Sequence, residues 1–128
     1  MIVDASAILA ILLREPERYE FRRIIAEAAE PVISPFNFLE ASVRADKLGE
    51  AESKGLDAII AAGGIDIVPT TAEQAMIARD AYARYGKGNH PAKLNLGDCF
   101  AYALAKARSE PLLFKGEDFR QTDIEAAI

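Results

Sequence analysis

Four acidic side chains are placed where they could act together: Asp4, Glu40, Asp98 and Asp118. Asp4 and Asp118 each follow a short apolar run, whereas Glu40 and Asp98 lie in segments with helical spacing. In an open α/β sheet, ligands bind at the edge formed by the carboxyl ends of the strands. Carboxylates gathered there repel one another unless a hard divalent cation binds them. These residue types therefore predict a Mg²⁺ or Mn²⁺ site suited to phosphodiester hydrolysis by a metal-activated water.

Each of these acids also has a purely local interpretation. Asp4 could cap the helix that follows it, and Glu40 could form a surface ion pair with Arg44. Asp98 could compensate the dipole at the start of its helix, and Asp118 could be a loop acid or the cap of a short helix. Only their gathering at one place favours the chemical interpretation over the local ones.

Neighbouring residues leave further alternatives open. Ser6 could support the Asp4 carboxylate or could simply begin the helix. Glu117 and Asp123 also follow the last apolar run, so that either could replace Asp118 as the fourth acid.

Charge is unevenly distributed along the chain. The 15 basic and 20 acidic residues give a formal net charge of −5, which argues against a general polyanion binder. The segment 81–97, however, contains no acid. Its side chains Arg84, Lys87, His90 and Lys93 lead directly to Asp98 and predict a phosphate-binding loop beside the acids. The same composition is also typical of an ordinary solvated loop.

The elements that must position these residues alternate along the chain. Short apolar runs predict strands over 1–3, 31–33, 65–68 and 111–114, each followed by helical spacing. This alternation indicates a parallel sheet between helices. The chain has no internal repeat and no long linker. We therefore expect an α/β fold of three layers, a short, mainly parallel sheet flanked by helices, in a single domain covering 1–128.

Capping residues predict where the helices begin. A helix over 17–30 follows Pro16, and the helix that contains Glu40 begins at Ser34 and Pro35. The start of a helix ending near residue 85 is marked by one of two capping pairs, Thr70 with Glu73 or Thr71 with Gln74.

The helix that carries Asp98 has the clearest pattern. Asn95 is its predicted cap, and Lys106 and Arg108 lie in the last turn, where cations suit the helix dipole. The spacing predicts that its inward face consists of Leu96, Cys99, Phe100, Ala103 and Ala107.

Composition excludes several other classes of protein. A single Cys99 and a single His90 cannot build a disulfide or a zinc site of several soft ligands. No apolar run approaches the roughly 20 residues needed to cross a membrane. An acid at position 4 argues against a signal peptide, so we expect a cytoplasmic protein. No glycine-rich phosphate loop follows the first strand, which argues against nucleotide-binding α/β folds.

The segments around the four acids resemble a known family, the PIN-domain proteins, and more narrowly the VapC-type toxins of bacterial type II toxin–antitoxin pairs. The segment 1–7 resembles the family's opening strand and first acid, and Glu40 resembles its second acid. The segments 94–105 and 112–119 resemble the parts that carry the third and fourth acids. The resemblance extends essentially from end to end.

This resemblance implies a PIN-like fold and a Mg²⁺- or Mn²⁺-dependent endoribonuclease. Asp4 and Asp98 would be the acids most directly in contact with metal, and Glu40 and Asp118 would complete the site, with Ser6 in support. It further implies an RNA substrate, a homodimer and a cognate VapB-type antitoxin whose tail covers the active site.

A second class of function remains open at this point. In a non-catalytic regulatory or phosphoacceptor module, similar to a response-regulator receiver, the same acids would bind an ion without cutting RNA. Lys115 follows the last predicted strand, as a receiver requires, but no second acid lies beside Asp4.

Overall fold

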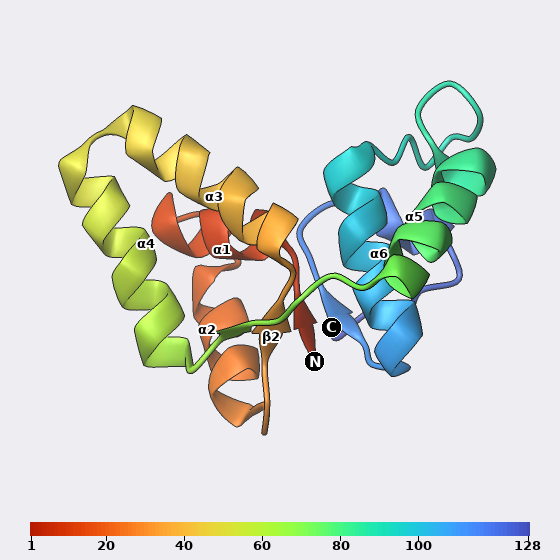
Figure 1. Ribbon diagram of the computed structural model, residues 1–128. Helices are drawn as coiled ribbons and strands as arrows, with labels where there is room; N and C mark the ends of the chain where they lie inside the picture. Colours follow the sequence, from red (N-terminus) through yellow and green to blue (C-terminus); the bar gives the residue numbers. More distant parts are fainter.

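A short parallel sheet lies between two groups of helices in the computed structural model, which describes residues 1–128 (Figure 1). The strands are β1 (Ile2–Val3), β2 (Val32–Ile33), β3 (Asp66–Ile67) and β4 (Leu112–Leu113). They pair in parallel in the order β3-β2-β1-β4. The predicted α/β class and the positions of all four strands are confirmed.

Four helices cover one face of the sheet and two cover the other (Figure 1). The first group is α1 (Ala5–Leu12), α2 (Arg18–Glu27), α3 (Pro35–Leu48) and α4 (Glu50–Gly63). The second group is α5 (Ala72–Tyr85) and α6 (Leu96–Arg108), and a short 3₁₀ helix, η1 (Phe119–Gln121), follows β4. No helix is both long enough and apolar enough to span a membrane.

The three buried strands contribute to two separate cores because side chains alternate across a strand. Their first residues pack with α5 and α6, and their second residues pack with α1 to α4. The two sets are Ile2, Val32 and Leu112 on one face, and Val3, Ile33 and Leu113 on the other. A strand covered on both faces needs apolar residues on both faces. These three strands are therefore apolar throughout and do not alternate between apolar and polar residues.

The predicted helix starts agree with the observed caps. The Ser34 hydroxyl accepts a hydrogen bond from the Asn37 amide at 3.1 Å, and Pro35 occupies the first turn of α3. Of the two pairs proposed for α5, the second is correct, because the Thr71 hydroxyl accepts from the Gln74 amide at 3.1 Å.

Two predictions about the helices are wrong in detail. The helix predicted over 17–30 begins at Arg18 and ends at Glu27, because Pro31 disfavours helical backbone in the residue before it and the chain becomes extended at Ala28. The predicted inward face of α6 fails at both ends, since Leu96 is 63% exposed and Ala107 is exposed. At the N-terminal end Gly97 is buried while Leu96 is exposed, so the neighbours of α6 cover a different side of the helix there from the one that the spacing indicates.

The parallel pairing places two predicted acids at one edge of the sheet. β1 and β4 are neighbours, and the Asp4 amide donates to the Leu113 carbonyl at 2.9 Å. The Lys115 amide donates to the Ser6 hydroxyl at 3.0 Å, so the loop after β4 is joined to the first turn of α1. α3 and α6 pack against each other and bring their own acids to this region.

Candidate active site

Asp4 lies at the carboxyl end of β1 and caps α1. Its Oδ2 accepts a hydrogen bond from the Ser6 amide at 3.0 Å. Its Oδ1 is buried and has no hydrogen-bond partner. Burial raises the pKa of the Asp4 carboxyl, and hydrogen bonds from Ser6 oppose this only in part. The local interpretation of Asp4 as a cap is therefore correct, but it accounts for only one of the two carboxylate oxygens.

Glu40 projects from α3 and is half-buried. No ion pair joins it to Arg44, so the surface-pair interpretation is wrong. Its Oε1 instead accepts a hydrogen bond from the Asn37 side chain at 3.4 Å. Burial raises the pKa of Glu40, and the nearby Asp4 carboxylate raises it further. Glu40 therefore belongs to the same electrostatic environment as Asp4.

Asp98 lies in the first turn of α6 and completes a capping box. Its Oδ2 accepts from the Asn95 amide at 3.0 Å, and the Asn95 side chain accepts from the Asp98 amide at 2.8 Å. Burial raises the pKa of Asp98 to about 7, against the hydrogen bond from Asn95, and the carboxylates of Asp4, Glu40 and Asp118 add to the shift. The carboxylates of the other three acids thus all lie close enough to Asp98 to raise its pKa.

The fourth acid had three candidates, and their surroundings differ. Asp118 is exposed in the loop after β4 and is close enough to raise the pKa of Asp98. Asp123 is bound by the Tyr102 hydroxyl at 2.7 Å and by the Lys106 ammonium at 2.8 Å. Although burial acts in the opposite direction, these bonds hold the pKa of Asp123 below its ordinary value. Glu117 is exposed, and its Oε2 lies 3.9 Å from Nε of Arg120, with which it forms an ion pair.

The donor set is suited to a hard cation, although it is not assembled as a finished coordination sphere. As the side chains stand, no three Asp, Glu, His or Cys residues form a group that could hold a metal ion. Mg²⁺ is usually bound by only one or two carboxylates and keeps several waters. The buried, unpaired Oδ1 of Asp4 is an oxygen that lacks the partner such a group normally has. The residues therefore fit Mg²⁺ or Mn²⁺.

The predicted basic loop joins α5 to the start of α6 (Figure 1). Lys87 and Lys93 are exposed and form no ion pair. Arg84 donates to the Tyr85 hydroxyl at 2.9 Å, and its guanidinium lies over that ring. His90 accepts from the Ala92 amide at 3.0 Å through Nδ1. Arg84 thus lies in the last turn of α5 and not in the loop, His90 makes a contact within the loop, and the two lysines form no ion pair.

Two polar contacts that the sequence did not reveal surround Glu40. Asn37 is fully buried and donates to the Gly97 carbonyl at 2.9 Å. Gly97 lies so close to Glu40 that a Cβ atom there would be 2.7 Å from Oε2. A glycine within a helix, directly before Asp98, was the only signal of this contact, and its meaning depends on how α3 packs against α6.

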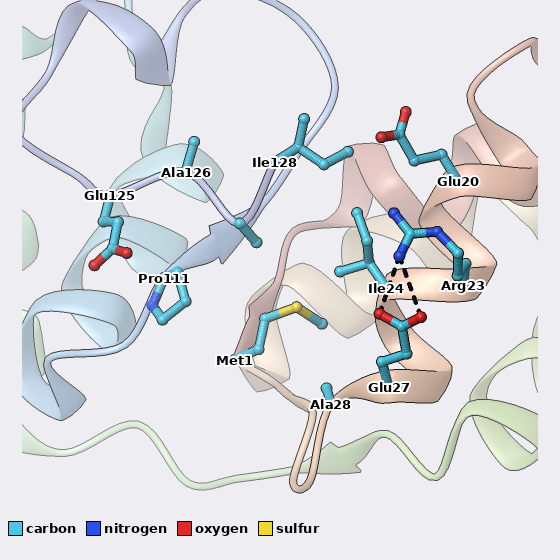
Figure 2. A pocket seen from close by; sticks show the side chains of 11 residues that line it. Met1, Glu20, Arg23, Ile24, Glu27, Ala28, Pro111, Glu125, Ala126 and Ile128 are labelled. Atoms are coloured by element: carbon cyan, nitrogen blue, oxygen red, sulfur yellow. Dashed lines mark hydrogen bonds and ion pairs between the residues drawn. The ribbon is translucent and has the colours of Figure 1, made fainter.

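Two surface grooves lie away from the acids. One is formed by Met1, α2 and the C-terminal segment, and Figure 2 shows Arg23 paired with Glu27 on its wall. The other lies between α1, α2 and α4. Neither is lined by Asp4, Glu40, Asp98 or Asp118.

Comparison with known proteins places this arrangement in a family. Residues 1–125 match the family model for the PIN domain, so the chain belongs to the PIN-domain family. It is 43% identical to a protein of Mycolicibacterium smegmatis named ribonuclease VapC, over 98% of each chain.

Solved structures share the fold. The crystal structure of VapC20 of Mycobacterium tuberculosis, a toxin that cleaves the sarcin–ricin loop, covers 96% of this chain with a TM-score of 0.75 at 16% identity, and 95% of its own chain is matched. A toxin–antitoxin complex from Klebsiella pneumoniae covers 95% of this chain, and 92% of its own, with a TM-score of 0.72 at 18% identity. The predicted PIN-like fold is confirmed.

Proposed function

We propose that this chain is a VapC-type toxin, an endoribonuclease that hydrolyses RNA phosphodiester bonds with Mg²⁺ or Mn²⁺. The observation that carries this proposal is the proximity of three further carboxylates to Asp98, in a chain 43% identical to a ribonuclease VapC. Four acids without a compensating cation in one region are unfavourable, and a divalent cation relieves the repulsion.

The acids have distinct roles in this proposal. Asp4, Glu40, Asp98 and Asp118 hold the metal, with Asp4 and Asp98 as its most direct ligands. When bound there, the metal supplies a nucleophile at neutral pH and stabilises negative charge on the phosphate. Ser6 directs Asp4 Oδ2 through its amide and holds the loop that carries Asp118 through its hydroxyl.

The basic loop is proposed to bind the RNA backbone. Lys87 and Lys93 are free to contact phosphates, because no carboxylate pairs with them. Arg84, in the last turn of α5, contacts Tyr85, and His90 contacts Ala92 within the loop; their remaining donor groups are proposed as additional phosphate contacts.

The proposed partners are a VapB-type antitoxin and a second copy of the chain. The Klebsiella neighbour is itself a toxin–antitoxin complex. An acidic chain of net charge −5 suits a basic antitoxin tail, in which a cationic side chain could compete with the metal. Phe36, Leu39 and Val43 leave an apolar stripe exposed on α3, which supports a homodimer. We propose that the chain and its antitoxin act in the cytoplasm.

The receiver-like alternative is not favoured. A receiver needs its late lysine at the acid site, but the Lys115 ammonium pairs with Glu15 and Glu17, between α1 and α2. It forms no ion pair with any of the four acids.

The proposal is tested by incubating the purified, antitoxin-free chain with total cellular RNA and, separately, with single-stranded DNA. Reactions contain Mg²⁺, Mn²⁺ or a chelator, and are repeated with Asp98→Asn, Asp118→Asn and Asp123→Asn. We expect discrete RNA cuts that need metal, Asp98 and Asp118, and that survive Asp123→Asn. An RNA pool left intact by the folded wild-type chain under every condition would contradict the proposal.

A further inference from the structure

The side chain of Asn37 joins α3 to α6 beside Glu40. It is fully buried, and its amide nitrogen donates to the Gly97 carbonyl at 2.9 Å and to Glu40 Oε1 at 3.4 Å. Its amide oxygen accepts from the Ser34 hydroxyl. Burying an amide is unfavourable unless its groups are hydrogen-bonded. Here the amide oxygen and the amide nitrogen of Asn37 both have partners. These partners are the cap residue of α3, the second turn of α3 and the first turn of α6.

Gly97 lies at the other side of the Glu40 carboxylate. A Cβ atom at this position would meet Glu40 Oε2 at 2.7 Å, Oε1 at 3.0 Å and Cδ at 3.1 Å, and these are its three nearest neighbours. The backbone here is ordinary helix, so conformation does not require glycine. Alanine is the better helix former. The missing side chain therefore matters for the room it gives to Glu40.

We propose that Asn37 and Gly97 are positioning residues for Glu40. The Asn37 amide directs the Glu40 carboxylate toward α6, and Gly97 gives that carboxylate space next to the turn that carries Asp98. Glu40 thereby reaches the acid site from a separate helix. This inference rests on the proposed function, because it assigns the two residues to the metal site.

Gly97→Ala separates positioning from stability. The clash falls on the end of a flexible side chain, so Glu40 moves and the backbone stays. We expect the midpoint of thermal unfolding to be unchanged or higher. Calorimetric titration with Mn²⁺ alone should show an affinity about 10- to 100-fold weaker, the usual effect of disturbing residues that orient metal ligands.

Asn37→Leu removes the amide while keeping a side chain of similar size, and we expect a comparable loss of Mn²⁺ affinity. Ser42→Ala is the matched control, because its hydroxyl donates to the Phe38 carbonyl within α3 and does not reach α6. Leu56→Ala controls for general destabilisation, because it opens the core on the α1 to α4 side. Both controls should retain wild-type Mn²⁺ affinity when folded.

A double-mutant cycle identifies Glu40 as the residue through which Gly97 acts. In a Glu40→Ala chain, Gly97→Ala should cause no further loss of Mn²⁺ affinity. An equal loss in both backgrounds, or no loss in the wild-type background, would overturn the inference while leaving the proposed function intact. A folded wild-type chain that binds no Mn²⁺ would instead contradict the proposed function, and the inference with it.

Discussion

One oxygen of Asp4 accepts a hydrogen bond at the start of α1, while the other is buried without a partner. Asp98 is similar, because its Oδ2 accepts from the Asn95 amide. In both residues the capping bond fixes the direction of the carboxylate. The local and the chemical interpretations of these acids are therefore compatible, since the cap orients the group that faces the site.

The raised pKa values predict how stability varies with pH in the absence of metal. The pKa of folded Asp98 is about 7, against an ordinary value of 3.8, so the folded state binds this proton more tightly than the unfolded state. The stability that this proton contributes is therefore fully present below the ordinary pKa of 3.8 and is lost as the pH rises through about 7. Asp4 and Glu40 act in the same direction.

Thermal unfolding in chelator should therefore give a higher midpoint at pH 5.5 than at pH 8 for the wild-type chain. In Asp98→Asn the difference between the two pH values should shrink, because one of the carboxyls with a raised pKa is gone. Asn can still accept the Asn95 hydrogen bond, so the variant should fold. Wild-type and variant chains with the same pH dependence would contradict this explanation.

The residues of the site were predictable to different degrees. Asp4, Asp98 and Asp118 could be proposed because strand ends and a helix start mark where their side chains emerge. Glu40 lies in the second turn of α3 and was proposed from its resemblance to the family's second acid. Sequence favoured Asp118 but left Asp123 open, because the hydrogen bonds of Tyr102 and Lys106 to Asp123 depend on tertiary packing. The contacts of Asn37 with Gly97 join residues 60 positions apart, so no local pattern indicates them.

At the scale of elements, the proposed binding of RNA by the loop between α5 and α6 can be tested directly. Two backbone hydrogen bonds join the two ends of this loop. The Lys87 amide donates to the Leu94 carbonyl at 2.9 Å, and the Leu94 amide donates to the Tyr85 carbonyl at 3.0 Å. These bonds hold the loop in shape while the two lysine side chains remain free.

Lys87→Ala and Lys93→Ala should each weaken RNA binding and reduce its salt dependence. Each lost phosphate contact lowers the slope of log K against log salt by about 0.7 for single strands. The measurement is RNA binding by Asp98→Asn chains, which do not cut, at several salt concentrations. Lys47→Ala, exposed on α3, is the control and should leave the slope unchanged. Equal slopes for all variants would show that the loop does not contact RNA.

Element types were predicted well, and their buried faces less well. Caps such as Ser34 and Asn95 act through hydrogen bonds to residues nearby in sequence, so a local pattern identifies them. The exposure of Leu96, beside the buried Gly97, depends on which side of α6 the neighbouring elements cover. Tertiary packing determines which side of a helix is buried at each position, and helical spacing alone does not reveal it.

At the scale of the whole molecule, the sheet separates two cores, and α3 from one side also packs against α6 from the other. α6 lies in the core with α5 and carries Asp98, so stability and site geometry depend on the same helix. The overall fold was predictable because three of the four strand runs are apolar at every position, which indicates helices on both faces, whereas the run 65–68 contains Asp66.

Leu104→Ala tests the contribution of this core. Leu104 is 1% exposed, so truncation should lower the free energy of unfolding by about 2–5 kcal/mol, measured by urea denaturation. Leu96→Ala on the same helix is the matched control, and its 63% exposure predicts a change within about 0.5 kcal/mol. Similar losses for the two variants would mean that α6 is not packed as described.

The central claim is that the acid site around Asp98 cuts RNA with a bound divalent cation. It is tested most directly by measuring single-turnover RNA cleavage and Mn²⁺ binding over the same range of Mn²⁺ concentration. Cleavage should rise as Mn²⁺ binds, be absent in chelator, and be lost in Asp98→Asn. Cleavage at full rate in chelator, or in Asp98→Asn, would contradict the claim.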